Sequence, residues 1–257
     1  MNRPLVIAHR GYSSRYVENT QSAYEGAIEI GADVVETDAR LSRDGQVYAC
    51  HDANLARIAM NGDARAIADL GAAELDAVAL MGNERLSRLP VTLTRIAPRR
   101  PILIDVKTPD LALIEAVVRD VLAHDAVGLA WIGVRDAAQM RRARDLEPAL
   151  KLLAFLPDYA RADEFEQAGA RVFRVWEGEV AQPAAARVLR EKPTWVTMGG
   201  KGTPCAVGDT TPERLARILE LQPQGVLVND PLLMMAPDTS RHPATGSSPP
   251  SSTSSSL

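Results

Sequence analysis

The chain has 257 residues, of which 46% are hydrophobic and 24% are charged, and its formal net charge is −4. This length suits one large domain with a single core, and the slightly acidic charge balance gives no electrostatic case for binding nucleic acid. The two cysteines are too few for a disulfide framework, so reduced thiols in a cytoplasmic enzyme are expected.

No apolar run of the sequence predicts targeting or a membrane span. Residues 4–8 form a run shorter than the roughly 7–15 apolar residues of a signal peptide. No run approaches the ~18 apolar residues of a membrane helix, so we expect a cytoplasmic protein. Residues 236–257 are rich in Ser, Thr and Pro, and this composition predicts a disordered tail without catalytic function.

The N-terminal part of the chain contains three strand-like runs, at residues 5–8, 33–41 and 46–50. A helix is expected after the first run, with Asn19 or Thr20 as its N-cap and Gly31 as its C-terminal stop. Asp44 and Gly45 make a hairpin-type turn between the second and third runs. Residues 53–89 have a different character and predict a small insertion with one or two short helices.

From residue 90 onward, strand-like and helix-like segments alternate. Strands are expected at residues 102–106, 129–134, 150–155, 171–175, 195–197 and 225–228. Helices are expected between them at residues 111–123, 136–145, 160–168, 181–190 and 211–221. With the two N-terminal strands this gives eight strand–helix units, which favours an α/β fold of the (β/α)₈ (TIM) barrel type with a small insertion after the second strand, residues 1–235 forming the catalytic domain. The rival, an open doubly wound sheet, usually opens with a Gly-rich phosphate loop that the first strand here lacks.

Acidic residues occur at the ends of two predicted strands. Glu36 and Asp38 are two apart, so their side chains point to the same face and repel unless a cation lies between them. An isolated pair of this kind is more often engaged in a salt bridge or a loop cap. Asp105 and Lys107 follow the next strand, and three acids together favour a site for a hard divalent cation, although an Asp105–Lys107 ion pair remains an alternative.

Two of the four histidines, His9 and His51, follow predicted strands beside these acids. Imidazoles titrate near neutral pH and suit general acid and base catalysis. Arg10 and Lys107 supply positive charge of the kind that holds phosphate. The other two histidines do not suggest a site, because His124 falls at a helix C-terminus and His242 in the tail.

No nucleophile motif such as Gly-x-Ser-x-Gly, and no His-x-His metal pair, competes with this set. The residues themselves therefore indicate metal-assisted cleavage of a phosphate ester. The order of several motifs resembles the glycerophosphodiester phosphodiesterase family. These motifs are His9-Arg10-Gly11, Glu18-Asn19-Thr20, Glu36-x-Asp38, Asp44-Gly45, His51-Asp52, Leu89-Pro90, Asp105-x-Lys107, Trp195-Val-Thr and Asn229-Asp230-Pro231.

The resemblance implies a TIM barrel that hydrolyses glycerophosphodiesters to glycerol 3-phosphate and an alcohol, in lipid and glycerol metabolism. It implies His9 and His51 as the acid/base pair and Arg10 and Lys107 as phosphate contacts. The resemblance also implies that Glu36 and Asp38, with Asp105 at the position of the third ligand, hold a divalent cation, Mg²⁺, Ca²⁺ or Mn²⁺. The expected partner is the small-molecule substrate, with no nucleic acid and no membrane span.

Two features depart from the family pattern that the sequence resembles. The third ligand in the family is usually Glu, whereas this chain has Asp105, which is one methylene shorter. After the seventh strand the chain carries Lys201 in a Gly-rich segment, and the substrate pocket is expected to include Trp195, Phe155 and Lys201. Two alternatives stay open: a phospholipase D-like lyase acting on lysophospholipids or sphingolipids, and a catalytically weak barrel that binds phosphodiesters.

Overall fold

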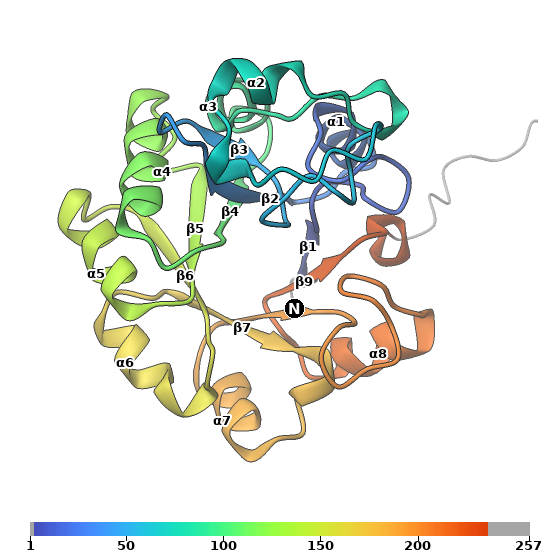
Figure 1. Ribbon diagram of the computed structural model, residues 1–257. Coiled ribbons are helices and arrows are strands. Elements are labelled where there is room, and N and C mark those ends of the chain that lie inside the picture. Colours follow the sequence, from blue (N-terminus) through green and yellow to red (C-terminus); the bar gives the residue numbers. More distant parts are fainter. Residues whose placement is uncertain (1–2, 236–257) are drawn as a thin grey trace, which may run out of the picture.

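Eight parallel strands close into a barrel in a computed structural model that describes residues 3–235. The sheet order is β1-β9-β8-β7-β6-β5-β4-β2, and β1 pairs with β2 to complete the ring. Helices surround this ring on the outside (Figure 1). The predicted α/β class and TIM-barrel architecture are confirmed. The expected tail, residues 236–257, lies outside the described residues.

The first strand–helix unit follows the sequence pattern closely. β1 (Leu5–Ala8) leads through a loop to α1 (Gln21–Glu29), and Thr20 caps this helix by accepting a hydrogen bond from the backbone of Ala23. Asn19, the other capping candidate, instead turns its side chain toward β2 (Val34–Leu41). β3 (Val47–Ala49) returns antiparallel to β2 and ends beside His51.

Residues 53–89 pack into a small unit over one edge of the barrel, at the top of Figure 1. Its elements are η1 (Ile67–Asp69), α2 (Ala72–Ala77) and η2 (Met81–Asn83), around an apolar cluster of their own. The barrel helix that belongs to β2, α3 (Leu89–Ile96), begins only after this unit. Helix α3 was not predicted from the sequence, because it is short and has Pro90 in its first turn. Pro is tolerated in the first helical turn, where its missing N–H has no intrahelical role.

The remaining units alternate regularly around the ring. The strands are β4 (Ile102–Val106), β5 (Ala130–Val134), β6 (Lys151–Phe155), β7 (Val172–Trp176), β8 (Thr194–Thr197) and β9 (Gly225–Val228). The helices are α4 (Leu111–Ala123), α5 (Ala137–Leu146), α6 (Ala162–Gln167), α7 (Pro183–Glu191) and α8 (Pro212–Glu220), with one-turn helices η3 (Tyr159–Arg161), η4 (Glu177–Glu179) and η5 (Pro231–Met234). These bounds confirm the predicted alternation to within one or two residues for most elements.

The barrel interior explains why polar groups collect at one end of the ring. Side chains alternate along a strand, so a residue two positions beyond an interior one also points inward. The lower interior is apolar, and its buried members include Ile7, Val34, Leu103, Leu153, Val172, Trp195 and Leu227. Two residues beyond each of these, at the C-terminal ends of the strands, lie His9, Glu36, Asp105, Phe155, Arg174, Thr197 and Asn229. The mouth of the barrel is therefore the place for a site.

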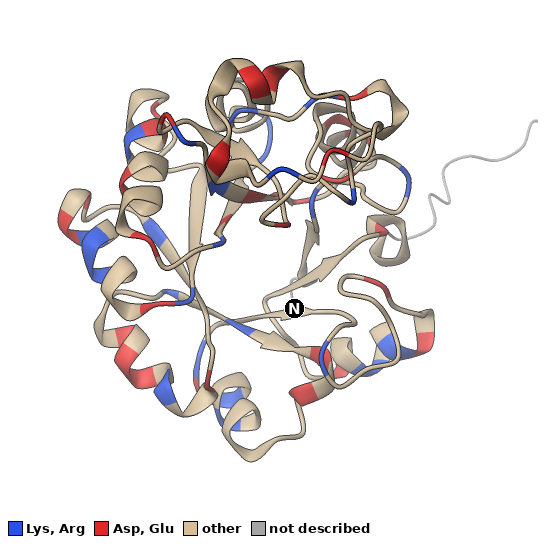
Figure 2. Cartoon of the chain, viewed as in Figure 1, with Lys and Arg blue, Asp and Glu red and all other residues tan. Residues whose placement is uncertain are grey.

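On the outside, the helices carry charges of both signs side by side (Figure 2). Arg142 with Glu115, and Arg187 with Glu191, are examples of these exposed pairs. Such pairs each contribute little to stability, about 0–1 kcal/mol. Among residues 3–235 no helix combines the length and the apolar character that crossing a bilayer requires.

Candidate active site

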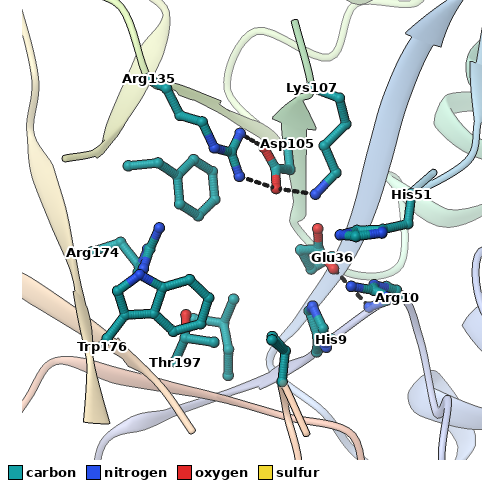
Figure 3. Close-up of a pocket in the computed structure, with 13 residues that line it drawn as sticks. His9, Arg10, Glu36, His51, Asp105, Lys107, Arg135, Arg174, Trp176 and Thr197 are labelled. Atoms are coloured by element: carbon teal, nitrogen blue, oxygen red, sulfur yellow. Dashed lines mark hydrogen bonds and ion pairs between the residues drawn. The ribbon is translucent and has the colours of Figure 1, made fainter. Parts of the chain in front are cut away.

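A cavity at the C-terminal mouth of the barrel gathers most of the residues that the sequence singled out (Figure 3). Eight of the residues that line it are titratable: His9, Arg10, Glu36, His51, Asp105, Lys107, Arg135 and Arg174. The other lining residues are Phe155, Trp176, Thr197, Val207 and Leu227. This many ionisable residues around one cavity suit a small substrate that carries charge itself.

Three buried carboxylates converge at this mouth. Glu36, Asp38 and Asp105 each offer an oxygen atom, and these atoms lie within 4.8 Å of one another. The parallel register sets Asp38 directly beside Asp105 on neighbouring strands β2 and β4. Three anionic oxygen donors so close together match the preference of hard cations such as Mg²⁺ and Ca²⁺.

Glu36 is the member of the trio that most needs a cation. It is 1% exposed, and within residues 3–235 it forms no ion pair; its Oε2 accepts the backbone N–H of Arg10 at 2.6 Å. Burial raises the pKa of Glu36 well above its usual range, and the charges of Asp38 and Asp105 raise it further. A buried carboxyl in this position needs a proton or a cation, so the donor set fits a divalent ion.

Asp105 and Asp38 are instead balanced by side chains of the protein. Lys107 Nζ lies 2.6 Å from Asp38 Oδ1 and 2.7 Å from Asp105 Oδ2. The Arg135 guanidinium donates hydrogen bonds to both carboxylate oxygens of Asp105. Burial alone would raise the pKa of Asp38, but Lys107 and Arg10 lower it to about 2. The Asp105–Lys107 ion pair, which was the alternative to a cation site, therefore coexists with the acidic cluster.

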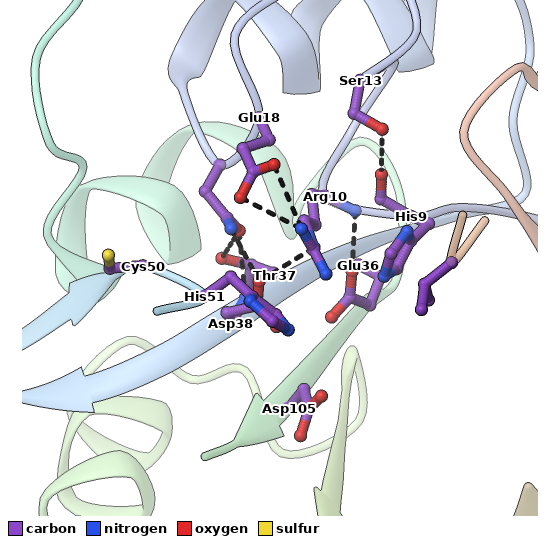
Figure 4. A network of polar contacts seen from close by, with 12 residues as sticks. His9, Arg10, Ser13, Glu18, Glu36, Thr37, Asp38, Cys50, His51 and Asp105 are labelled. Carbon is purple, nitrogen blue, oxygen red and sulfur yellow. Dashed lines mark hydrogen bonds and ion pairs between the residues drawn. The ribbon is translucent and has the colours of Figure 1, made fainter. Parts of the chain in front are cut away.

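Arg10 contacts the acidic cluster through Asp38 (Figure 4). Its guanidinium contacts Glu18 at 3.1 Å and Asp38 at 3.3 Å, and its backbone adopts a φ of 58°, unusual for a residue with a side chain. Gly11 follows, and a Cβ there would lie 2.6 Å from the backbone of Ala23, so only glycine fits. Backbone strain of this kind is typical of functional sites.

His9 is buried and held in one orientation. Its Nδ1 lies 2.7 Å from Asn229 Oδ1, and the Asn229 amide donates to the Val207 carbonyl and to Asp209. Because an amide oxygen can only accept, His9 Nδ1 carries the proton and Nε2 is left with a free lone pair. Burial, then the charge of Arg10, lowers the pKa of His9 to about 4, so the ring is neutral at pH 7. The glycine at position 208 leaves room for the His9–Asn229 hydrogen bond, because a Cβ atom at that position would lie 2.6 Å from His9 Nδ1.

His51 has a more polar environment. Its Nδ1 lies 2.7 Å from Asp52 Oδ1, and Asp52 is in turn held by Arg57 from the inserted unit. Burial and the charge of Lys107 lower the pKa of His51, whereas the hydrogen bond to Asp52 opposes them. The two histidines therefore differ: one has an amide partner, and the other has a carboxylate that favours its protonated form.

Two arginines of the cavity were not anticipated from the sequence. Arg135 directly follows strand β5, and that position alone is a signal, because strand ends form the mouth. Arg174 lies within β7 among apolar residues, where a lone charge on the inward face is a second signal. Both were available in the sequence, but neither belongs to a motif.

Two of the three expected pocket residues lie elsewhere. Trp195, near the start of β8, is 1% exposed and packs against Trp131 in the lower interior, and the mouth tryptophan is Trp176. Lys201 forms an exposed ion pair with Glu179 at 2.6 Å and does not line the cavity. Phe155 does line it. His124 caps the C-terminus of α4, and His242 lies outside the described residues.

Several known proteins have sequences similar to part or most of this chain. A "Probable glycerophosphodiester phosphodiesterase 1" from Mycobacterium tuberculosis is 50% identical over 54 residues, which is 21% of this chain and 20% of that protein. "Glycerophosphodiester phosphodiesterase GDPD4" from Arabidopsis thaliana is 28% identical over 89% of this chain and 71% of its own length. The match to the first of these curated relatives thus spans only about a fifth of its length.

Solved structures share the whole barrel. A glycerophosphodiester phosphodiesterase from Thermotoga maritima superposes with a TM-score of 0.72 at 22% identity, covering 91% of this chain and 98% of the other. An Oleispira antarctica phosphodiesterase, solved in complex with the product sn-glycerol-3-phosphate, gives a TM-score of 0.74 at 19% identity, with coverage of 89% and 94%. At these identities the likeness establishes the fold.

The sequence profile of one family covers the part of the chain that contributes the histidines and carboxylates of the mouth. It matches residues 9–145, which include both cavity histidines and all three carboxylates, and its description is "Glycerophosphoryl diester phosphodiesterase family". A match over more than half of the chain, together with the barrel and its site, makes this chain a member of the glycerophosphoryl diester phosphodiesterase family.

Proposed function

We propose that the protein is a metal-dependent phosphodiesterase that hydrolyses glycerophosphodiesters to glycerol 3-phosphate and an alcohol. One observation carries the proposal: His9 and His51 line the same cavity as Glu36, Asp105 and Lys107. An acid, a base, a cation site and a phosphate-binding cation are what the cleavage of a phosphate diester requires. Family membership supports the same reaction.

The hydrogen-bond partners of the two histidines support distinct starting roles. His9 is neutral with a lone pair on Nε2, so it begins as the base. The pKa of His51 is lowered as well, but its carboxylate partner Asp52 opposes that shift by stabilising an imidazolium, so His51 begins as the acid. Pairs of groups whose surroundings separate their proton affinities in this way are the usual solution for acid/base chemistry at neutral pH.

The reaction then proceeds in two steps. His9 takes the proton from the glycerol 2-hydroxyl, whose oxygen attacks phosphorus, while His51 protonates the departing alcohol oxygen. A water molecule opens the resulting cyclic phosphate with the histidine roles reversed, giving glycerol 3-phosphate. Arg10 and Lys107 lie beside the acids, where they hold the phosphate oxygens and balance the negative charge that develops on them.

A divalent cation, Mg²⁺, Ca²⁺ or Mn²⁺, would be held by Glu36, Asp38 and Asp105, and when bound it would neutralise the charge that develops on the phosphoryl oxygens. We place the protein in the cytoplasm, in glycerol and lipid metabolism. The free state of Cys50 and Cys205 agrees with a reducing compartment. Residues 1–235 form the catalytic barrel in this proposal, residues 53–89 the insertion, and 236–257 a tail with no catalytic role.

The decisive experiment follows release of glycerol 3-phosphate from defined glycerophosphodiesters, with EDTA and with each of the three metals added back. We expect turnover that EDTA abolishes and at least one metal restores. Turnover that survives chelation would exclude the metal, and absence of turnover with every metal would exclude the reaction.

The lyase alternative is tested in the same assay. Rat "Lysophospholipase D GDPD1" is 34% identical over 123 residues, 43% of this chain, so lysophospholipids belong among the substrates tried. A lyase would accumulate the cyclic phosphate, whereas a hydrolase converts it onward. Phosphorus NMR separates these two products directly.

A further inference from the structure

Arg174 lies in the cavity against aromatic rings, and among residues 3–235 it has no carboxylate partner. Its side chain lines the cavity, the residue is 5% exposed, and its Nε and Nη1 atoms have no hydrogen-bond acceptor. Within residues 3–235 it forms no ion pair either. A buried charge without a partner is costly, so a protein that retains one usually uses it to bind a ligand of opposite charge.

The neighbouring charges explain why Arg174 stays unpaired. Asp105 is occupied by Lys107 and Arg135, and Glu179 accepts from Tyr159 at 2.7 Å and pairs with Lys201 at 2.6 Å. The nearby carboxylates are therefore already neutralised. The positive charge of Arg174 remains available to an anion that enters the cavity.

The aromatic rings around Arg174 are covered by the guanidinium groups of arginines. Its guanidinium lies 3.8 Å from the centroid of the Trp176 ring and 5.3 Å from that of Phe155. Arg135 covers Phe155 as well, at 4.5 Å. An aromatic wall of this kind would otherwise suit a quaternary ammonium such as choline. Here the arginines hold those ring faces, and a cationic head group would be repelled.

Strand β7 places Arg174 on the opposite side of the ring from the strands that position the histidines and Lys107. In the ring order, β7 lies three strands from β1, which positions His9 and Arg10, and three strands from β4, which carries Asp105 and leads to Lys107. Figure 3 shows Arg174 and Trp176 across the cavity from His51 and Lys107. A diester whose phosphate sits between the histidines would extend its other end toward Arg174.

We propose that Arg174 is a specificity-determining residue that binds a second anionic group, a carboxylate or a phosphate monoester, on the alcohol portion of the glycerophosphodiester. The inference rests on the proposed function and names its substrate class. A guanidinium is suited to either group because its planar donors can bind two oxygens at once. The preferred substrates are then anionic alcohols, and choline diesters are poor ones.

Two matched substrate pairs test the inference. Glycerophosphoserine differs from glycerophosphoethanolamine by one carboxylate, and glycerophosphoinositol 4-phosphate differs from glycerophosphoinositol by one phosphate. In at least one pair we expect the wild-type protein to favour the anionic member in kcat/KM by about tenfold or more. The Arg174→Gln variant should reduce this preference about 10- to 100-fold, the range for losing one charged hydrogen-bonding partner.

Two further variants accompany Arg174→Gln. Arg174→Lys keeps the charge but not the planar donors, so it should retain an intermediate preference. Arg171→Gln removes an exposed arginine just before the same strand and should leave the preference unchanged. Thermal unfolding curves of all three variants show whether each is folded. If Arg174→Gln does not fold, the substrate preference of Arg174→Lys is compared with that of the wild type instead.

The outcomes separate this inference from the proposed function. Loss of preference in the serine pair identifies a carboxylate ligand, and loss in the inositol pair identifies a phosphate. An unchanged preference in both pairs, including an equal loss for all four diesters, would overturn the inference and leave the phosphodiesterase standing. If the wild-type protein hydrolyses none of the four, the proposed function fails and the inference with it.

Discussion

The two sides of the barrel mouth differ in how completely their charges are paired. On the side built by β1, β2 and β4, the cations Arg10 and Lys107 both contact carboxylates within 3.3 Å. On the side built by β6 and β7, Arg174 lies against aromatic rings and forms no ion pair with any of residues 3–235. A single cavity joins the two sides.

The difference separates two tasks. Ion pairs hold His51, Asp38 and Asp105 in place, and hydrogen bonds hold His9 and Glu36, which is the kind of fixed arrangement that a reaction centre needs. Arg174 is buried without a carboxylate partner, and the aromatic rings beside it offset only part of the cost of burying its charge, so an anionic ligand would offset the rest. The β1–β4 side therefore suits the reaction, and the β7 side suits the choice of substrate.

The largest effect is expected from the histidines of the paired side. His9→Gln and His51→Gln should each lower kcat by about 10²–10⁴-fold, the usual contribution of a general acid or base. His124→Gln, at the C-terminus of α4, is the matched control and should keep wild-type turnover. Near-normal kcat in either cavity variant would show that the paired side is not the reaction centre.

A somewhat smaller loss is expected from Glu36→Gln. The amide keeps the shape of the side chain but removes the anionic ligand, so activity should fall about 100-fold and need more metal for half-saturation. Since burial keeps the pKa of Glu36 high, the variant should fold as well as the wild type without metal. A metal titration followed by calorimetry measures this, and unaltered metal affinity would remove Glu36 from the ligand set.

The paired side was largely predictable from the sequence, and the unpaired side was not. His9, Glu36, Asp105 and Lys107 stand at or just beyond strand ends within short local motifs, so the alternation of strands and helices was enough to bring them together. Arg174 stands alone in an apolar strand, and only the closed ring shows that it faces the same cavity.

Two errors trace to strand geometry. The predicted strand 171–175 stopped one residue short of Trp176, which ends β7 and lines the cavity. Trp195 was expected there, but it is the second residue of β8 and lies in the lower interior. Helix α3 was not predicted, because the inserted unit separates it from β2 in the sequence and a proline near its start interrupts the helical pattern. Which partner a buried charge finds depends on side-chain positions that no spacing rule supplies.

A pH difference should distinguish His9 from the rest of the paired side. Its pKa falls to about 4 in the folded protein from an unfolded value near 6.5. Between these pH values the unfolded chain binds a proton that the folded protein does not, so this group's contribution to stability decreases as pH falls, by about 3 kcal/mol in total. Denaturant unfolding of the wild type and of His9→Gln at pH 7, 5.5 and 4.5 should show the curves converging toward acid. Parallel curves would contradict the burial of a neutral His9.

The smallest effect concerns the unpaired side and is a gain. Arg174→Met should raise the free energy of unfolding by about 1 kcal/mol, or the melting temperature by roughly 2–4 °C. Burial and the charge of Arg135 lower the pKa of Arg174 to about 10, which corresponds to about 3 kcal/mol against the charged form. The cation–π contact with Trp176 offsets about 2 kcal/mol of that cost. Arg171→Met, on the exposed side, should change stability by less than about 0.5 kcal/mol. A destabilised Arg174→Met variant would mean that the arginine stabilises the barrel itself, and the contrast between the two sides of the mouth would be lost.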